Sequence, residues 1–446
     1  MARAKKFSRR KFIQAVGVGA AALGGEFAPH RARGEKRASK TLKICRWSHF
    51  VPAFDKWFVD KYVKEWGEKN DTQVTVDTIA VTAINARAAA EVSMGKGHDL
   101  FWFSWPPAAY EEMVIDHKEV YQECEKNYGA PIPLAVKSTY NPRTRKYFAF
   151  PESFTPDPIN YRSDLWGEIG VKPDTWDAIR QGGKKIKNKT GIPVGIGQSA
   201  EVDTSMAMLA ILYSFGASLQ DENNQLVLNS KNTLEAVKFV KALYQEAMTP
   251  EVLAWDPSSN NRAMLSEKAS LVLNAISITR EAENKGLDIG SKILLLKAAG
   301  GPLRRLGAPN QTGAYVIWKF SENKEGAKKF LVDFIGNFRA AFIASELFNF
   351  PCFPKLVRDL EELLSKDEKA TPAGKYAVIA DALEWTADLG YPGYVNAAVD
   401  EVLATWVLNT MFAQASTGER TPEQAIKEAE AKCRRIWAKW QQRKLI

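Results

Sequence analysis

The feature that most constrains the fold is an alternation of strand-like and helix-like segments early in the chain. Residues 41–47 and 73–81 have the apolar pattern of strands, and residues 99–103 form the nearly continuous apolar run of a strand buried on both faces. Residues 52–69 repeat large apolar side chains at helical spacing, and residues 83–94 form an alanine-rich segment that ends before glycine. Strand, helix, strand, helix, strand in this order predicts a parallel sheet with helical crossovers.

Segments beyond residue 147 continue the α/β character without an internal repeat. Apolar spacing predicts helices over residues 175–187, 204–215, 233–248 and 324–335, and strands over residues 271–278 and 314–318. The charged stretch over residues 421–441 is typical of an amphipathic helix, with Thr421 and Pro422 at its start. The chain after residue 40 has about 400 residues, enough for roughly two domains.

The first 40 residues have the layout of an export signal. Arg9 and Arg10 stand just before an apolar, uncharged run over residues 12–25. This order indicates a twin-arginine signal, which addresses a folded protein to the Tat translocase and the periplasm. The run is shorter than the roughly 20 residues of a membrane span, and the alternative is a basic arm that leads into a core helix. No clear cleavage site follows, so an uncleaved leader that tethers the protein to the membrane stays open.

The net charge of +9 belongs to this leader. Residues 1–40 contain eleven Lys/Arg and two Asp/Glu, whereas residues 41–446 contain 50 of each. A nucleic-acid-binding protein carries its positive excess on the folded part, because phosphate neutralisation supplies much of the affinity. The charge distribution therefore argues against nucleic acid as a partner.

No set of residues typical of a catalytic or metal site stands out. The four histidines and four cysteines are widely spread, without the spacing of metal ligands, so we expect no catalytic residue, metal or cofactor. We expect free, buried cysteines, since a protein that folds before export folds in a reducing compartment. A periplasmic oxidoreductase, another class of protein exported by the twin-arginine route, is the alternative.

Several segments carry a family resemblance in a consistent order. They are residues 146–151 (KYFAFP), 159–166 (INYRSDLW), 170–177 (GVKPDTWD), 318–331 (WKFSENKEGAKKFL) and 417–425 (TGERTPEQA). Together they resemble the extracellular solute-binding proteins of the maltose-binding type, which serve ABC importers. The resemblance covers nearly all of the chain after residue 41.

This resemblance implies the two-lobed periplasmic-binding-protein fold of type II, in which two α/β lobes with mainly parallel sheets are joined by hinge strands. We expect one lobe from residues 41–150 plus 306–350, and the other from residues 151–305 plus 351–446. It further implies a monomer that traps a small solute between its lobes and delivers it to ABC permease subunits. The family often has Tyr-Asn-Lys at residues 160–162 and a Gly-aromatic pair near residues 274–276, where this chain has NYR and NAI, so the ligand class stays open.

Candidate ligand contacts follow from the rule that ligands bind outside the carboxyl ends of parallel strands. Trp47, Ser48 and His49 follow the first predicted strand, and Ser104 and Trp105 follow the third. For the first three, a packed tryptophan in the turn that starts a helix is the alternative.

Further candidates lie in loops and strand ends of the second region. They are Glu152, Thr155 and Asp157 where the resemblance places a hinge crossing, Trp255 and Asp256 in a Pro- and Asn-rich loop, Asn274 and Ser277 in the predicted strand over residues 271–278, Asn310 and Gln311 before the next strand, and Tyr391 in a turn. Solvated loop carboxylates, a loop-anchoring tryptophan and ordinary turn capping are the alternatives.

These residues suggest three classes of solute. Aromatic and planar polar side chains favour a sugar, oligosaccharide or polyol. A polyamine would use Glu152, Asp157 and Asp256 as counter-charges within an aromatic cage. A glycerol-phosphate compound would need arginines in the cleft, where Arg46, Arg162 and Arg262 are the candidates.

Overall fold

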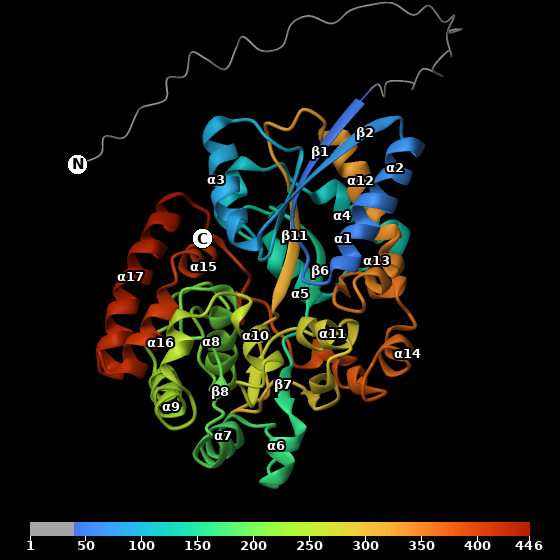
Figure 1. The fold of residues 1–446 in the computed structure, drawn as a ribbon. Coiled ribbons are helices and arrows are strands. Elements are labelled where there is room, and N and C mark those ends of the chain that lie inside the picture. Colours follow the sequence, from blue (N-terminus) through green and yellow to red (C-terminus); the bar gives the residue numbers. More distant parts are fainter. Residues whose placement is uncertain (1–39) are drawn as a thin grey trace, which may run out of the picture. The chain divides into compact units, whose positions relative to one another are not determined.

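The predicted alternation over residues 41–103 folds into a parallel β-unit (Figure 1). The computed structural model describes residues 40–446 and places β1 (Lys40–Trp47) between β2 (Thr72–Ile79) and β3 (Leu100–Phe103). Both neighbours run parallel to β1, as predicted. The twin-arginine leader predicted around Arg9 and Arg10 lies outside the described residues.

Three further strands complete a six-stranded sheet in the order β12-β6-β11-β3-β1-β2. They are β6 (Phe150–Thr155), β11 (Gln311–Ile317) and β12 (Phe350–Pro351). All three pair antiparallel with their neighbours. The sheet is therefore less parallel than expected, because β6 leads into the second sheet, β11 returns from it, and the two lie side by side in opposite directions.

The helices predicted over residues 52–69, 83–94 and 324–335 are present in the six-stranded lobe, together with three that were not predicted. Residues 52–69 form one helical stretch, made of α1 (Pro52–Trp57), a π-helical turn (Phe58–Tyr62) and α2 (Val63–Lys69). The other helices of this lobe are α3 (Ile84–Met94), α4 (Lys118–Tyr128), α5 (Pro133–Thr139), α12 (Lys324–Gly336) and α13 (Phe338–Ala344). Phe58 of the first stretch packs edge-on against Phe330 and Phe334 of α12, with ring centroids 6.1 and 5.6 Å apart.

The second lobe is built on a four-stranded sheet in the order β10-β7-β9-β8. Its strands are β7 (Ile159–Arg162), β8 (Val194–Gly195), β9 (Leu271–Leu273) and β10 (Ile293–Leu296). Only β8 and β9 pair in parallel, so this sheet is also more mixed than expected. Two separate sheets connected by β6, β11 and β12 establish the two-lobed α/β fold.

The helices of the second lobe lie around this sheet (Figure 1). They are α6 (Ser163–Glu168), α7 (Trp176–Thr190), α8 (Val202–Ser214), α9 (Lys231–Ala247), α10 (Ser259–Leu265), α11 (Ser277–Asn284), α14 (Leu360–Ser365), α15 (Ala397–Ala404), α16 (Val407–Thr417) and α17 (Pro422–Gln442). The short 3₁₀ turns of the two lobes are η2 (Val81–Ala83), η3 (Ala108–Met113), η4 (Pro250–Ala254), η5 (Asp288–Ser291), η6 (Pro354–Leu356), η7 (Lys375–Ile379) and η8 (Ala382–Glu384). A separate two-stranded hairpin is formed by β4 (Tyr140–Asn141) and β5 (Lys146–Tyr147).

The strand predicted over residues 271–278 is wrong beyond Leu273. The side chain of Asn274 accepts a hydrogen bond from the backbone N–H of Ala275 at 2.7 Å, and the chain turns there. Helix α11 then begins at Ser277. The apolar run therefore combines a short strand with the first turn of a helix, two structures that apolarity alone does not separate.

Local sequence signals fix several helices. The helix predicted near residue 421 begins with a capping box, in which the Thr421 hydroxyl accepts from the Gln424 backbone N–H and the Gln424 side chain accepts from the Thr421 N–H. Helix α7 carries two adjacent glycines, and a Cβ at Gly182 would overlap with the ring of Trp166. These glycines therefore serve close helix packing.

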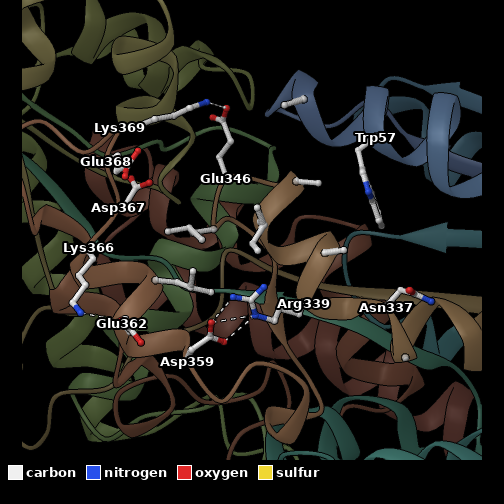
Figure 2. A pocket seen from close by; sticks show the side chains of 17 residues that line it. Trp57, Asn337, Arg339, Glu346, Asp359, Glu362, Lys366, Asp367, Glu368 and Lys369 are labelled. Atoms are coloured by element: carbon white, nitrogen blue, oxygen red, sulfur yellow. Dashed lines mark hydrogen bonds and ion pairs between the residues drawn. The ribbon is translucent and has the colours of Figure 1, made fainter.

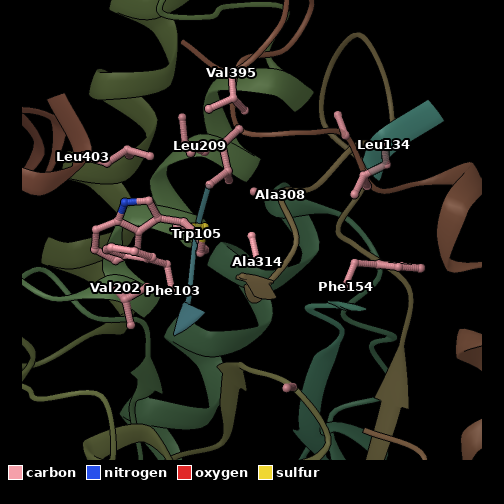
Figure 3. Close-up of a cluster of buried hydrophobic side chains, with 14 of the residues drawn as sticks. Phe103, Trp105, Leu134, Phe154, Val202, Leu209, Ala308, Ala314, Val395 and Leu403 are labelled. Carbon is pink, nitrogen blue, oxygen red and sulfur yellow. The ribbon is translucent and has the colours of Figure 1, made fainter. Parts of the chain in front are cut away.

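A continuous apolar core runs from one lobe into the other (Figure 3). Phe103 and Trp105 from the end of β3 lie beside Val202 and Leu209 of α8 and Leu403 of α15. The buried cysteines are Cys45, Cys124, Cys352 and Cys433, all with free thiols. Among residues 40–446, no helix has both the length and the apolarity to cross a membrane.

Candidate functional site

A largely buried polar cluster lies where the strands that connect the lobes meet the start of α8. We define this interlobe polar cluster by its residues: Asp157, Glu201, Asp203, Asn260, Asn261, Asn274 and Asn310. Its members follow β6, cap α8, lie on α10, follow β9 and precede β11. Elements from both sheets therefore contribute to one set of side chains.

The amide of Asn310 is the centre of the cluster. Its Nδ2 lies 3.4 Å from Asp157 Oδ1, 3.3 Å from Asp203 Oδ1 and 3.4 Å from Asn274 Oδ1. An amide nitrogen has only two hydrogens, so it cannot satisfy three acceptors, and all three distances are long for a hydrogen bond. The cluster consequently has acceptor capacity that a hydroxyl-rich or ammonium-bearing ligand can use.

Two further amides surround this centre. Asn260 Nδ2 donates to Asp203 Oδ2 at 2.8 Å, and Asn274 Nδ2 donates to Asn261 Oδ1 at 2.6 Å. Asn261 Nδ2 in turn donates to the Ser277 hydroxyl at 3.3 Å. The network thus extends from Asp203 at the start of α8 to the start of α11.

The carboxylates of the cluster resist ionisation. Burial raises the pKa of Asp157 to about 7, although the Asn310 amide opposes the rise. Burial, reinforced by the charges of Glu201 and Asp157, raises the pKa of Asp203 well above its usual range, and burial also raises the pKa of Glu201. Within residues 40–446, no Lys or Arg forms an ion pair with these three carboxylates. A positive ligand or several hydroxyl donors would stabilise their charged forms.

A small cavity adjoins the cluster. Glu201, Asp203, Trp255, Asp256 and Asn260 line it, and its volume is about 10 Å³. All residues that line it belong to the second lobe, and its volume holds about one water molecule, so a ligand of sugar size does not fit there without rearrangement. Across the lobes, Asn310 Nδ2 lies 3.3 Å from Asp203 Oδ1, and we call this contacting arrangement of the two lobes closed.

Eight of the sequence-predicted residues lie in or beside this region. They are Thr155, Asp157, Trp255, Asp256, Asn274, Ser277, Asn310 and Gln311. Thr155 and Gln311 are register partners on β6 and β11, and the Thr155 carbonyl accepts from the Asn310 N–H at 2.8 Å. Asp256 is exposed and pairs with Arg262 at 2.9 Å.

Two of the predicted residues, Trp47 and His49, pack inside the six-stranded lobe instead, and Ser48 between them is exposed. Trp47 is buried and stacks on Trp102 with ring centroids 5.1 Å apart. His49 is buried 3.2 Å from Asn349 Oδ1, and burial lowers its pKa to about 3, so its ring is neutral. Ser48 donates to Asp55 Oδ2 at 3.4 Å near the start of α1. These contacts match the packed turn that was the alternative interpretation.

The other predicted residues have partners outside the cluster. Trp105 Nε1 donates to Asp400 Oδ1 of α15 at 2.9 Å, and the Ser104 carbonyl accepts from the Thr312 N–H at 3.1 Å. Tyr391 Oη accepts from Arg304 Nη1 at 2.5 Å. Glu152 is buried near Arg46, and burial raises its pKa to about 6.

Glu201, Asp203 and Asn260 were not among the sequence-predicted residues. The helix predicted to start at Thr204 begins at Val202, with Glu201 as its cap; the Glu201 carboxylate accepts from the Asp203 N–H at 2.7 Å. Two acids before a strongly apolar helix are a start signal visible in the sequence. Their proximity to Asp157 and Asn310 depends on the tertiary fold.

Comparison with known proteins identifies the family. The profile of the bacterial extracellular solute-binding proteins matches residues 52–342, so the chain belongs to this family. A protein of Brucella abortus named only as a binding protein is 24% identical over 229 residues, 50% of each chain. The arabinooligosaccharide-binding protein of Bacillus subtilis is 23% identical over 235 residues, 48% of this chain and 50% of the relative. The chain spans about half the length of the curated relatives it matches.

Solved structures share the fold. The solute-binding protein of Thermotoga lettingae, crystallised with α-D-tagatose, superposes with a TM-score of 0.73 at 19% identity, covering 89% of this chain and all of that one. This similarity confirms the two-lobed periplasmic-binding-protein fold that the family resemblance implied.

Proposed function

We propose that this protein captures a sugar, oligosaccharide or polyol between its lobes and delivers it to the permease subunits of an ABC importer in the periplasm. The observation that carries the proposal is the interlobe polar cluster, in which Asn310 of one lobe meets carboxylate and amide groups of the other beside a cavity walled by Trp255. Carboxylates and amides suit sugar hydroxyls, and a flat indole suits the C–H face of a sugar ring. The names of the Bacillus and Thermotoga relatives, which mention an arabinooligosaccharide and tagatose, support this class.

Further parts of the proposal rest on the sequence. The twin-arginine segment around Arg9 and Arg10 would direct export by the Tat translocase, and the working form would be a monomer. The lobes would comprise residues 41–150 plus 306–350 and residues 151–305 plus 351–446. The protein would bind its solute without transforming it.

A cationic solute such as a polyamine is the second candidate. Asp157 and Glu201 are buried and Asp203 is half-buried, all three without a basic partner among residues 40–446, and an ammonium group would supply the missing charge. A phosphorylated solute has less support, because Arg162 and Arg262 pair with acids and Arg46 stacks over Phe54 and Phe58.

A ligand panel with a matched pair of variants tests the proposal. Arabino-oligosaccharides, tagatose, maltose, ribitol, putrescine and spermidine would be added to the protein lacking residues 1–39, and the unfolding temperature measured. A solute at a hundredfold excess over its Kd stabilises by about 2.7 kcal/mol. Stabilisation by polyamines alone would replace the sugar proposal with the second candidate, and no stabilisation by any solute would contradict both.

Asp157→Asn and Asp388→Asn form the matched pair. Burial raises the pKa of both carboxyls to about 7, but only Asp157 belongs to the cluster. We expect Asp157→Asn to remove most of the ligand-induced shift and Asp388→Asn to retain it. Equal loss in both variants would show that the effect is not local to the cluster.

A further inference from the structure

The end of helix α13 has a backbone conformation that its sequence does not favour. Glu346 and Leu347 both have left-handed backbone angles, with φ of 52° and 69°. The Leu347 N–H donates to the Phe342 carbonyl and the Glu346 N–H to the Ile343 carbonyl, both at 2.9 Å, which is a helix ending that usually places glycine at the first left-handed position. A glutamate there carries a conformational cost, so contacts that offset this cost are expected.

Three side chains from the opposite lobe hold Glu346. Arg280 Nε donates to the Glu346 carbonyl, Asn284 Nδ2 to Oε2 and Lys369 Nζ to Oε1, each at 2.7 Å. Figure 2 shows the Lys369 contact beside a groove of about 1330 Å³.

These partners and Glu346 belong to different lobes. Arg280 and Asn284 lie on α11, which packs against α10 and η5 beside the four-stranded sheet. Helix α13 packs against β12 at the edge of the six-stranded sheet. The contacts at Glu346 therefore join the lobes.

The partners are themselves firmly placed. Arg280 is buried, and its Nη1 lies 2.5 Å from Asp367 Oδ2 and 3.1 Å from Glu283 Oε2. Its guanidinium also lies over the ring of Tyr376, 4.0 Å from the centroid. Helix α11 begins at Ser277, which belongs to the hydrogen-bond network of the polar cluster. One eight-residue helix therefore connects that network to the contacts at Glu346.

We infer that Glu346 is a positioning residue that tethers α13 to α11 and favours the closed arrangement of the lobes. In the closed structure the tether has all three partners. Separation of the lobes would move α11 away from α13 and cost these contacts, so the conformational cost of a left-handed glutamate is offset only when the lobes are closed. The inference rests on the two-lobed fold and does not depend on which solute binds.

Glu346→Gly tests the inference because it removes the backbone cost and the carboxylate contacts together. Glycine removes the backbone cost, which largely offsets the lost contacts in the unfolding midpoint, while loss of the carboxylate should lower the closed-to-open ratio about tenfold. Lys369→Met removes the same ion pair from the other side and should shift the ratio in the same direction.

The readout is the distance distribution between spin labels in the ligand-free protein. Cysteines introduced at the exposed positions Ser93 on α3 and Asn188 on α7 would carry the labels, one in each lobe, since the four native cysteines are buried. This measurement needs no solute, so a failure of the ligand panel would leave it unaffected.

Glu267→Gly is the matched control. Glu267 is also a left-handed glutamate, with φ of 60°, and it pairs with Arg162 at 3.2 Å within the four-stranded lobe. We expect longer distances in Glu346→Gly and Lys369→Met and no change in Glu267→Gly. An unchanged distribution in Glu346→Gly or an equal shift in Glu267→Gly would overturn the inference.

Discussion

Replacing Asp157 by asparagine should stabilise the ligand-free protein at alkaline pH. Asp157 is buried, and its pKa is raised from 3.8 to about 7. The folded protein therefore holds this proton more tightly than the unfolded chain does. The stability that protonation contributes is complete below about pH 4 and is lost as the pH rises to about 7.

The magnitude follows from the two pKa values. Between pH 5 and pH 8, the titration of Asp157 should lower the free energy of unfolding by about 2.5 kcal/mol. Asparagine has nearly the same shape, and its carbonyl can still accept from Asn310. The variant should therefore match the wild type near pH 5, apart from a small constant difference, and gain about 2.5 kcal/mol over it by pH 8.

Urea unfolding at a series of pH values, followed by tryptophan fluorescence, measures this difference. Groups outside the cluster titrate in both proteins and cancel in the comparison. Asp256→Asn is the control of opposite sign, since Arg262 holds the pKa of the exposed Asp256 below its usual range. That control should lose less than about 1 kcal/mol at pH 8, and the loss should shrink toward pH 3. If the difference in unfolding free energy between the wild type and Asp157→Asn does not change with pH, the argument that Asp157 lies buried without a counter-charge is refuted.

Two further predictions concern helix packing and capping, both measured by urea unfolding. Gly182→Ala should destabilise the protein by about 1–3 kcal/mol because the new Cβ overlaps with Trp166. Gly167→Ala on α6, where the new Cβ meets open space, should stabilise the protein by about 0.5–1 kcal/mol. Equal effects of the two substitutions would contradict this interpretation of the packing. Thr421→Ala removes the hydroxyl that accepts from the Gln424 N–H and should cost about 1 kcal/mol, and an unchanged midpoint would show that the capping box contributes nothing.

Periodicity and local start signals predicted much of the fold. Residues 52–69 repeat large apolar side chains at helical spacing, and the strands on either side of them pair in parallel as expected. The order of strands beyond β3 could not be predicted this way. The position of β11 between β6 and β3 depends on pairing between segments more than 150 residues apart, which no local pattern encodes.

The candidate site likewise contains residues that the sequence indicated and residues that only the tertiary fold brings together. Asp157 is a candidate through the family resemblance, Asn274 as part of a predicted strand and Asn310 as a residue just before another, whereas their contacts with one another come from the fold. Asp203 carries a signal only for the start of a helix, and its approach to Asn310 arises from the packing of α8. Trp47 shows the limit of residue type as a guide, since stacking on Trp102 and stacking on a ligand demand the same flat side chain.

The central position of β11 in the six-stranded sheet has a consequence for synthesis of the chain. Residues 311–317 fill the space between β6 and β3, and they leave the ribosome only after the whole four-stranded sheet. Until then β3 and β6 present unpaired edges, which are sites of mispairing and aggregation. A chain that stops before residue 311 would lack the strand that joins the two halves of this sheet. Cutting the protein at a lobe boundary before that residue would therefore not give a first half that folds independently.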